Sequence, residues 1–276
     1  MAIVEYSLFR VKLVLPRQMS WLHYRVSRAE VFAASLEEKP DSQVRTGYKW
    51  HIGNVELYTP SSGYFAIGRT TRATIEKFDL ETGNFIEEEL ETSPYTHCVF
   101  DAEIGFIGIA KKNTLSPTAQ GIARRVEELL SRTNQVRENE IIVEISPIPD
   151  PDSFLREIEE AYAVLQFAAT FHRPNPFDAD ELFNRPLSVY LAAADGESGR
   201  TQIQGDNLNR EVLKAVTKST AATGNEASAK IKRVKGARAV KIHLSGSAFG
   251  TSYEEELHDP KQALMDLRNL YHHVRE

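Results

Sequence analysis

Residues 50–69, WHIGNVELYTPSSGYFAIGR, decide the fold class of this chain. They contain two runs rich in β-branched and aromatic side chains, WHIGNVELY and GYFAIGR, separated by the four residues TPSS. β-Branched and aromatic residues favour extended backbone, whereas proline and serine favour a turn. The stretch therefore predicts a β-hairpin.

The segments on either side of this hairpin have the same character. Residues 6–14 form a β-branched and aromatic run. Residues 75–80 and 85–90 alternate apolar and charged side chains around a Thr-Gly-Asn turn. Residues 98–110 hold two short apolar runs around Ala102-Glu103-Ile104-Gly105, which predicts a further hairpin. We expect residues 1–115 to form an antiparallel meander whose charged side chains face solvent.

The period of the apolar residues changes after residue 115. Ser116 and Pro117 suit an N-cap and a first helical turn, and apolar residues then recur at helical spacing as far as residue 132. Helices and strands alternate from there to the end of the chain. We expect an α+β fold, in which an antiparallel β-rich N-terminal half packs on a mixed α/β C-terminal half, residues 116–276.

The C-terminal half contains most of the predicted helices. After the first helix, the predicted elements are a strand over 140–148, a helix over 154–161, a strand over 162–173, a helix over 178–194 interrupted by Pro186, a strand over 200–204, a helix over 210–222 closed by Gly224, a hairpin of 228–234 with 237–244, and a helix from Asp259-Pro260 onward.

Composition limits the class of protein. The 276 residues are 41% hydrophobic and 26% charged, which is typical of a globular chain that buries about 75% of its unfolded surface. No apolar run approaches the roughly 20 residues that span a bilayer, and the start MAIVEYSLFR lacks the features of a signal peptide. We expect a cytoplasmic protein without membrane insertion, in which the single cysteine, Cys98, is a buried inert thiol.

Charge is segregated along the sequence. The whole chain has a net charge of -6, yet residues 206–243 contain nine basic and three acidic residues, a local charge of +6. The basic residues are Arg210, Lys214, Lys218, Lys230, Lys232, Arg233, Lys235, Arg238 and Lys241.

This basic segment predicts a nucleic-acid interface. Arg210, Lys214 and Lys218 are four residues apart and share one face of the predicted helix, and the predicted hairpin carries cations on both faces. Such charge neutralises phosphates, and the absence of aromatic residues from the segment favours backbone contacts to a duplex over stacking on single strands. The alternative is a solvated edge strand protected by lysine.

Residues 76–91 have the opposite charge, with seven acidic residues against Lys77. This acidic hairpin either docks a basic partner, such as the basic segment of a second copy of the chain, or is a solvated turn. Opposite charges on two hairpins favour a homodimer in which the hairpins meet between copies.

Motifs for cofactor or metal chemistry are missing. No HxH, HExxH or DxDxD spacing occurs, and neither GxGxxG nor GxxxxGK is present, so we expect no metal and no cofactor. Asp101 and Glu103 are similar to the acidic strand of metal-dependent nucleases, but the lysine pattern that completes such a site is missing.

The C-terminal RNLYHH contains a short catalytic pattern. Arg268, Asn269 and His273 have the Arg-Asn-x-x-x-His spacing that resembles the motif of HEPN ribonucleases, which implies metal-independent RNA cleavage with Arg268 and His273 as catalytic residues. HEPN domains are helical bundles, whereas strands precede this helix. We expect both residues to be structural.

The order of elements gives a wider resemblance. GNVELYTPSSGYFAIGR, CVFDAEIGFIGIAKKN, the following helix, EIIVEISPI and the basic C-terminal region resemble phage-exclusion proteins of the RexA type and KwaB-type subunits of Kiwa antiphage defence. The resemblance implies a cytoplasmic, dimeric, DNA-binding component of prokaryotic defence, without a recognised catalytic centre. It carries no motif that assigns a site residue.

We therefore expect a non-catalytic protein that binds duplex DNA through residues 206–243 and acts in antiphage defence or phage exclusion. A nuclease effector and a protein-interaction subunit, which binds a second subunit of a defence complex, are the alternatives. The sequence does not distinguish DNA from RNA as the ligand.

Overall fold

The computed structural model describes residues 3–14, 27–45, 47–172, 183–196, 198–244 and 248–275. The fold is α+β and contains two antiparallel sheets, so the predicted fold class is confirmed. The strands are β1 (Ile3–Val14), β2 (Asp41–Arg45), β3 (Tyr48–Thr59), β4 (Ser62–Asp79), β5 (Asn84–Thr92), β6 (Tyr95–Asp101), β7 (Phe106–Ala110), β8 (Ile142–Pro147), β9 (Ala163–His172), β10 (Ser198–Gln204), β11 (Ala227–Lys232), β12 (Val240–His243) and β13 (Gly250–Glu254). The helices are α1 (Arg28–Glu37), α2 (Ala119–Leu130), α3 (Asn134–Glu138), α4 (Asp152–Glu160), α5 (Asn184–Ala193), α6 (Arg210–Ala222), the short 3-10 helix η2 (Glu255–Leu257) and α7 (Pro260–Arg275).

The larger sheet has the strand order β13-β1-β7-β6-β4-β3-β2, with β5 paired to β4 and β8 paired to β1. The predicted hairpins β3–β4 and β6–β7 are both present. β8 and β13 lie on the same edge of β1, where Leu13 pairs with Val143 and Val4 pairs with Tyr253. This sheet therefore takes strands from both sides of residue 115.

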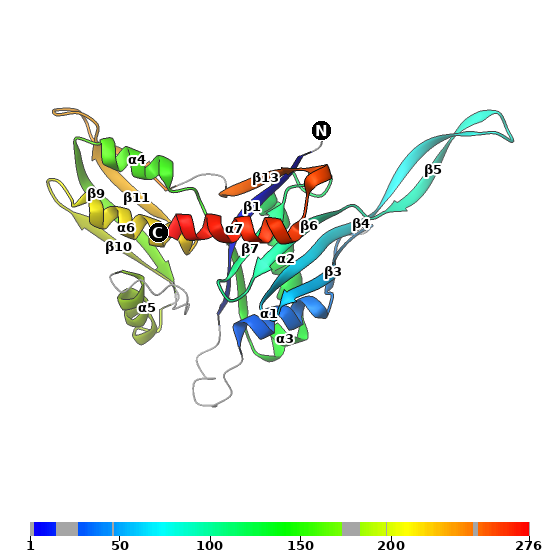
Figure 1. Cartoon of the computed structure of the whole chain (residues 1–276), viewed down its shortest axis with the longest axis horizontal. Helices are drawn as coiled ribbons and strands as arrows, with labels where there is room; N and C mark the ends of the chain where they lie inside the picture. Colours follow the sequence, from blue (N-terminus) through cyan, green and yellow to red (C-terminus); the bar gives the residue numbers. More distant parts are fainter. Residues whose placement is uncertain are drawn as a thin grey trace.

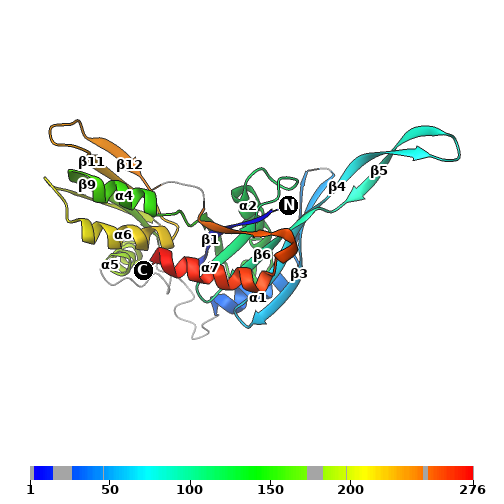
Figure 2. The same cartoon turned by 45° about the horizontal axis from the view of Figure 1, so that its top comes forward.

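Helices cover both faces of the larger sheet (Figures 1 and 2). On one face, apolar residues of α1, α2 and α3 pack against Phe9, Phe65 and Phe100. On the other face, α7 packs Leu264 and Leu267 against residues of β1, β6 and β7. The sheet is therefore the middle layer of three.

The smaller sheet has the order β10-β9-β11-β12. One of its faces is covered by α4 and α6, whose Ile158 and Leu213 belong to the same buried cluster as Phe167, Ala229 and the apolar residues of α7. Because one cluster includes residues of both sheets and α7, the smaller sheet packs on the larger one through that helix (Figure 1). The hairpin β11–β12 and helix α6 agree with the prediction.

Helix ends follow local side-chain chemistry. α2 begins two residues later than predicted, because the Thr118 hydroxyl accepts a hydrogen bond from Gly121 N at 3.1 Å and acts as the N-cap in place of Ser116. Asn209 caps α6, and Gly224 follows its end with a φ of +66°, which suits glycine.

Several expectations were wrong. The N-terminal half was expected to be all strands, but it contains α1, whose N-cap Ser27 accepts a hydrogen bond from Glu30 N at 3.4 Å. One continuous strand, β4, replaces the two strands predicted for residues 63–80. Pro186 lies in the first turn of α5, where no helical N–H is required, so it does not interrupt that helix. Residues 178–182 of the predicted helix lie outside the described residues.

Two further findings concern helix length and the thiol. None of the helices in the described ranges is long and apolar enough to cross a membrane. Cys98 is fully buried in the sheet, and burial raises the pKa of its thiol well above the ordinary value. The predicted buried thiol is confirmed.

Candidate nucleic-acid interface

The predicted basic segment is divided between two layers, the smaller sheet and the helices that cover it. α6 lies in the helix layer, whereas β11 and β12 lie in the sheet. The cations of residues 206–243 therefore do not form one surface, and each group has its own surroundings.

Two of the three cations of α6, Arg210 and Lys214, form polar contacts with other parts of the fold, whereas Lys218 lies beside them without an ion pair in the described ranges. The Arg210 guanidinium donates hydrogen bonds to the carbonyl oxygens of Ala161 and Tyr162. Lys214 Nζ lies 2.9 Å from Glu159 Oε1, and this hydrogen-bonded ion pair raises the pKa of Lys214. Arg210 and Lys214 thus tie α6 to α4 and to the start of β9.

Arg233, directly after β11, has the same kind of contact. Its Nη2 lies 3.0 and 3.1 Å from the two carboxylate oxygens of Glu157 on α4. This side chain reaches the helix layer from the sheet. It is already neutralised by a carboxylate.

The other face of the smaller sheet carries exposed cations. Successive residues of a strand point to opposite faces. Since Ala229 and Phe167 pair with each other and lie in the buried core beneath α6, Lys230 points away from the helices. Lys230 and Lys241 are directly opposite each other on β11 and β12, and both are exposed. We call this surface the open face.

A shallow cavity of about 70 Å³ lies on the open face. Its lining includes the small residues Ala168 and Ser228 and the longer side chains of Arg200, Lys241 and His243. The carboxylate residue Glu226 also lines it. The guanidinium, the ammonium and the Ser228 hydroxyl are hydrogen-bond donors that suit a phosphate oxygen.

The turn between β11 and β12 extends this positive surface. Lys235 and Arg238 are exposed in the turn, and Lys232 is half-buried at the end of β11. Within the described ranges, no carboxylate forms an ion pair with Arg200, Lys230, Lys235, Arg238 or Lys241. These five residues are defined here as the open-face cations.

Sequence reasoning missed Arg200, which lies outside residues 206–243. It pairs with Thr170 in the β10–β9 ladder and is exposed. Its neighbours Gln202 and Gln204 lie on the same face, because all three alternate with Thr201 and Ile203. That polar alternation was the signal in the sequence, but it does not say which other strand lies alongside.

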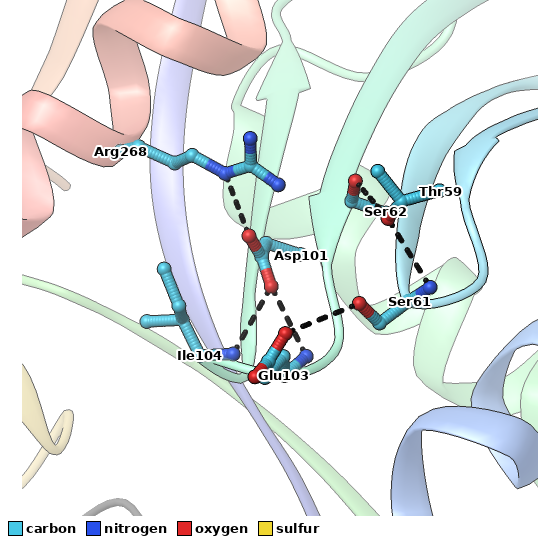
Figure 3. A network of polar contacts seen from close by, with 7 residues as sticks. All are labelled: Thr59, Ser61, Ser62, Asp101, Glu103, Ile104 and Arg268. Atoms are coloured by element: carbon cyan, nitrogen blue, oxygen red, sulfur yellow. Dashed lines mark hydrogen bonds and ion pairs between the residues drawn. The ribbon is translucent and has the colours of Figure 1, made fainter.

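Arg268 and Asp101, two candidates for nuclease chemistry, form one polar network (Figure 3). Arg268 Nε donates to Asp101 Oδ2 at 2.6 Å, and Asp101 Oδ1 accepts from the backbone N–H groups of Glu103 and Ile104, both at 3.1 Å. Asp101 is 3% exposed. The network joins α7 to the turn between β6 and β7, and every oxygen of the Asp101 carboxylate is used within the fold.

His273 has different surroundings. It lines a cavity of about 280 Å³ together with Lys214, Lys218, Arg156 and carboxylate residues of α4. Arg268 and His273 are five residues apart on α7, which separates their directions by about 140°. A single chain therefore does not present them in one site as the HEPN resemblance implies.

Two histidines that are 161 positions apart in the sequence meet beside α7. The ring centroids of His97 on β6 and His258, just before α7, are 4.7 Å apart. Hydrogen bonds join Tyr64 Oη to Nδ1 of His97 at 3.0 Å, and Tyr6 Oη to Nε2 of His258 at 2.8 Å. No spacing in the sequence could have indicated this pair.

Both histidines favour the neutral form. Burial lowers the pKa of His97, and the charges of His258 and Lys112 add to that effect, with Glu255 acting in the opposite direction. Burial also lowers the pKa of His258, against the opposing effect of Asp259 and Glu255. Across the described part of the chain, no group of three or more histidine, cysteine or carboxylate residues is arranged to hold a metal. The pair anchors the start of α7 on the sheet.

Comparison with known proteins adds no family assignment. No family model matches this chain, and no curated protein sequence matches it. The likeness to RexA-type and KwaB-type proteins stays a prediction.

Proposed function

We propose that this protein binds duplex nucleic acid, DNA in the first place, through the open-face cations. The observation that carries the proposal is the separation of cations in the smaller sheet. Arg210, Lys214 and Arg233 are tied to carbonyl or carboxylate oxygens of the fold, whereas the open-face cations are exposed without an ion pair in the described ranges. Two of them, Arg200 and Lys241, line the shallow cavity. Unpaired exposed cations on one surface supply the phosphate contacts that bind nucleic acid.

The chemistry of the surface favours a duplex. Residues 206–243 contain no aromatic side chain other than the imidazole of His243, and the residues of β10 on the same face, Ser198, Arg200, Gln202 and Gln204, are not aromatic either. Single strands are held largely by stacking of bases on aromatic rings, whereas duplexes are held by contacts to the phosphate backbone. Binding of this kind is independent of sequence.

The proposed role is that of a non-catalytic, cytoplasmic component of prokaryotic antiphage defence or phage exclusion. It follows from the resemblance to RexA-type and KwaB-type proteins, and the open face supports its DNA-binding part. A metal-independent ribonuclease is less well supported. Arg268 forms an ion pair with Asp101, whereas His273 lines the cavity between α4 and α6, away from Arg268.

Fluorescence anisotropy titration tests the proposal. The parent chain is titrated into duplex DNA, duplex RNA and single-stranded DNA at several salt concentrations, with and without Mg²⁺, and a gel records cleavage. The matched variants are Lys230→Gln/Arg238→Gln/Lys241→Gln and a control on the far helix layer, Lys39→Gln/Arg124→Gln/Arg137→Gln.

We expect tightest binding to duplex DNA. The open-face variant should reduce the slope of log affinity against log salt by about 0.9 for each phosphate that the variant no longer neutralises. The control variant removes the same charge from exposed positions and should bind like the parent. Equal binding by the parent and a folded open-face variant would show that the open face is not the interface. Tighter binding to duplex RNA would show that RNA, and not DNA, is the preferred ligand.

A further inference from the structure

A two-stranded ribbon projects from the body of the molecule. It consists of the outer part of β4, from Thr71 to Asp79, and its partner β5, and no other element lies beside it in either view (Figures 1 and 2). We call this ribbon, with its turn, the acidic arm. Six of its large apolar side chains are strongly exposed, namely Ile75 (38%), Phe78 (49%), Leu80 (88%), Phe85 (82%), Ile86 (38%) and Leu90 (40%).

Such exposure on a projecting ribbon indicates an interaction surface. Two-stranded hairpins are marginally stable on their own in water, and clustered apolar side chains on a surface mark contacts with another molecule. The arm therefore requires a partner, and its charge identifies one.

The two faces of the arm differ, because residues paired across an antiparallel ribbon point to the same side. One face holds the pairs Ala73–Leu90 and Lys77–Ile86 and the ion pair of Lys77 with Glu88, at 2.8 Å. The other face holds Glu76 directly opposite Glu87, next to Phe78 and Phe85. The two phenyl rings of this face have centroids 5.2 Å apart.

The Glu76–Glu87 pair is unfavourable in the isolated arm. Like charges directly opposite each other destabilise a ladder, and no cation forms an ion pair with either residue in the described ranges. The open face contains the counterpart, since Lys230 lies directly opposite Lys241. The repulsion within each like-charged pair is reduced when the oppositely charged pair approaches.

The apolar side chains of the arm lie beside its charges. The phenyl rings of Phe78 and Phe85 are next to the glutamate pair on the same face. On β12, Val240 pairs with the buried Ile231 and therefore lies on the face opposite Lys241. The correspondence between the arm and the open face is therefore one of charge.

The two surfaces lie at opposite ends of one chain. In Figure 1 the arm extends from one end of the long axis, and the smaller sheet forms the other end. The arm cannot reach its own open face in this arrangement. A two-fold axis perpendicular to the long axis places the arm end of each copy beside the smaller-sheet end of the other, so that the same contact can form twice.

We propose that the acidic face of the arm docks on the open face of a second copy, with Glu76 and Glu87 against Lys230 and Lys241, in a reciprocal two-fold dimer. The proposal rests on the open face assigned above as the nucleic-acid surface. It adds that arm and nucleic acid compete for this face. Nucleic acid binds after an arm is released.

A charge exchange tests the contact without nucleic acid. The arm variant is Glu76→Lys/Glu87→Lys, the sheet variant is Lys230→Glu/Lys241→Glu, and the control is Glu37→Lys/Glu138→Lys at exposed positions of α1 and α3. Light scattering measures the mass of each protein at low and moderate salt, after circular dichroism has shown that it is folded.

We expect the parent and the control to have twice the 31.1 kDa mass of the chain. Each charge variant alone should have the mass of one chain, because both of its contacts become repulsive. An equimolar mixture of the two variants should recover the two-chain mass, because both contacts are attractive again.

Three results would overturn the dimer. These are a parent of one-chain mass, a folded arm variant that remains dimeric, and a mixture that fails to recover the dimer. A mass that rises continuously with concentration would indicate an open head-to-tail chain instead of the closed pair.

The competition is measured separately by duplex DNA titration of the arm variant. If about one open face in ten is free in the parent, freeing all of them tightens apparent binding about tenfold. Equal affinity of parent and arm variant would contradict the competition. Loss of DNA binding with an intact dimer would instead remove the proposed function and leave the arm contact standing.

Discussion

The contact between α7 and the larger sheet and the open face of the smaller sheet use charged residues in opposite ways. Beside α7, Arg268 lies 2.6 Å from the buried carboxylate of Asp101, which also accepts two backbone hydrogen bonds. On the open face, Lys230 and Lys241 lie opposite each other and remain exposed. The difference shows that the partner within the fold decides whether a charge holds the structure or stays available to a ligand.

The largest effect expected from this comparison is on stability at Asp101. Asp101→Ala removes the partner of Arg268 and the acceptor of the Glu103 and Ile104 N–H groups. Breaking a buried pair on one side costs about 3–5 kcal/mol, and partial exposure of Arg268 reduces this to about 2–3 kcal/mol. Circular dichroism should show a Tm lower by about 4–12 °C.

The control for this prediction is Glu138→Ala, an exposed carboxylate on α3. It should leave the Tm unchanged. RNA cleavage by the parent that Arg268→Ala and His273→Ala both abolish, at unchanged Tm, would show that α7 is catalytic and would contradict the structural role of Arg268.

The second prediction concerns the dependence of stability on pH at the start of α7. The pKa values of His97 and His258 are lowered in the fold, mainly by burial. In the unfolded chain the ordinary histidine pKa is about 6.5. As pH falls below this value the unfolded state binds more protons than the folded state, so stability decreases until the lowered pKa values are passed.

Thermal unfolding between pH 7.5 and 5 measures this effect. The Tm of the parent should fall as the pH is lowered. The Tm of His97→Gln/His258→Gln should fall less over the same range, because glutamine cannot be protonated. Glutamine still offers a hydrogen-bond partner to Tyr64 and Tyr6. Parallel curves for the two proteins would show that the pair does not contribute.

The third prediction tests the open face at a single position. Arg200→Gln removes an exposed cation beside the cavity without removing a contact within the fold. Duplex DNA binding should weaken severalfold, the salt slope should fall by about 0.9, and the Tm should stay the same. An unchanged slope would exclude Arg200 from the interface.

Local patterns were sufficient to predict much of the fold. The hairpins β3–β4 and β6–β7, the helix α6 and the hairpin β11–β12 all depend on neighbours in the sequence. α1 was missed because its apolar residues lie in a strand-rich context, although Ser27 and Glu30 have the spacing of a capping box.

Long-range pairing could not be predicted in the same way. The sequence shows neither that Arg200 joins Lys241 around one cavity nor that His97 meets His258, because both depend on how distant strands and α7 come together. Glu157 and Glu159 likewise neutralise Arg233 and Lys214 only in the folded chain. The nine cations between residues 210 and 241 were therefore predicted to form one surface, whereas the fold divides them between the helix layer and the open face.

The smallest effect is expected at Lys214, which the sequence placed in the same interface as Lys230. The ion pair with Glu159 already neutralises this ammonium, so it has less charge to offer a phosphate. Lys214→Gln should leave the salt slope of duplex DNA binding unchanged, and because the pair is solvent-exposed, it should leave the Tm unchanged as well. Anisotropy titrations of this variant beside Arg200→Gln make the comparison direct. If Lys214→Gln lowers the slope by about 0.9, as expected for Arg200→Gln, phosphates also contact α6 and the distinction between paired and open cations fails.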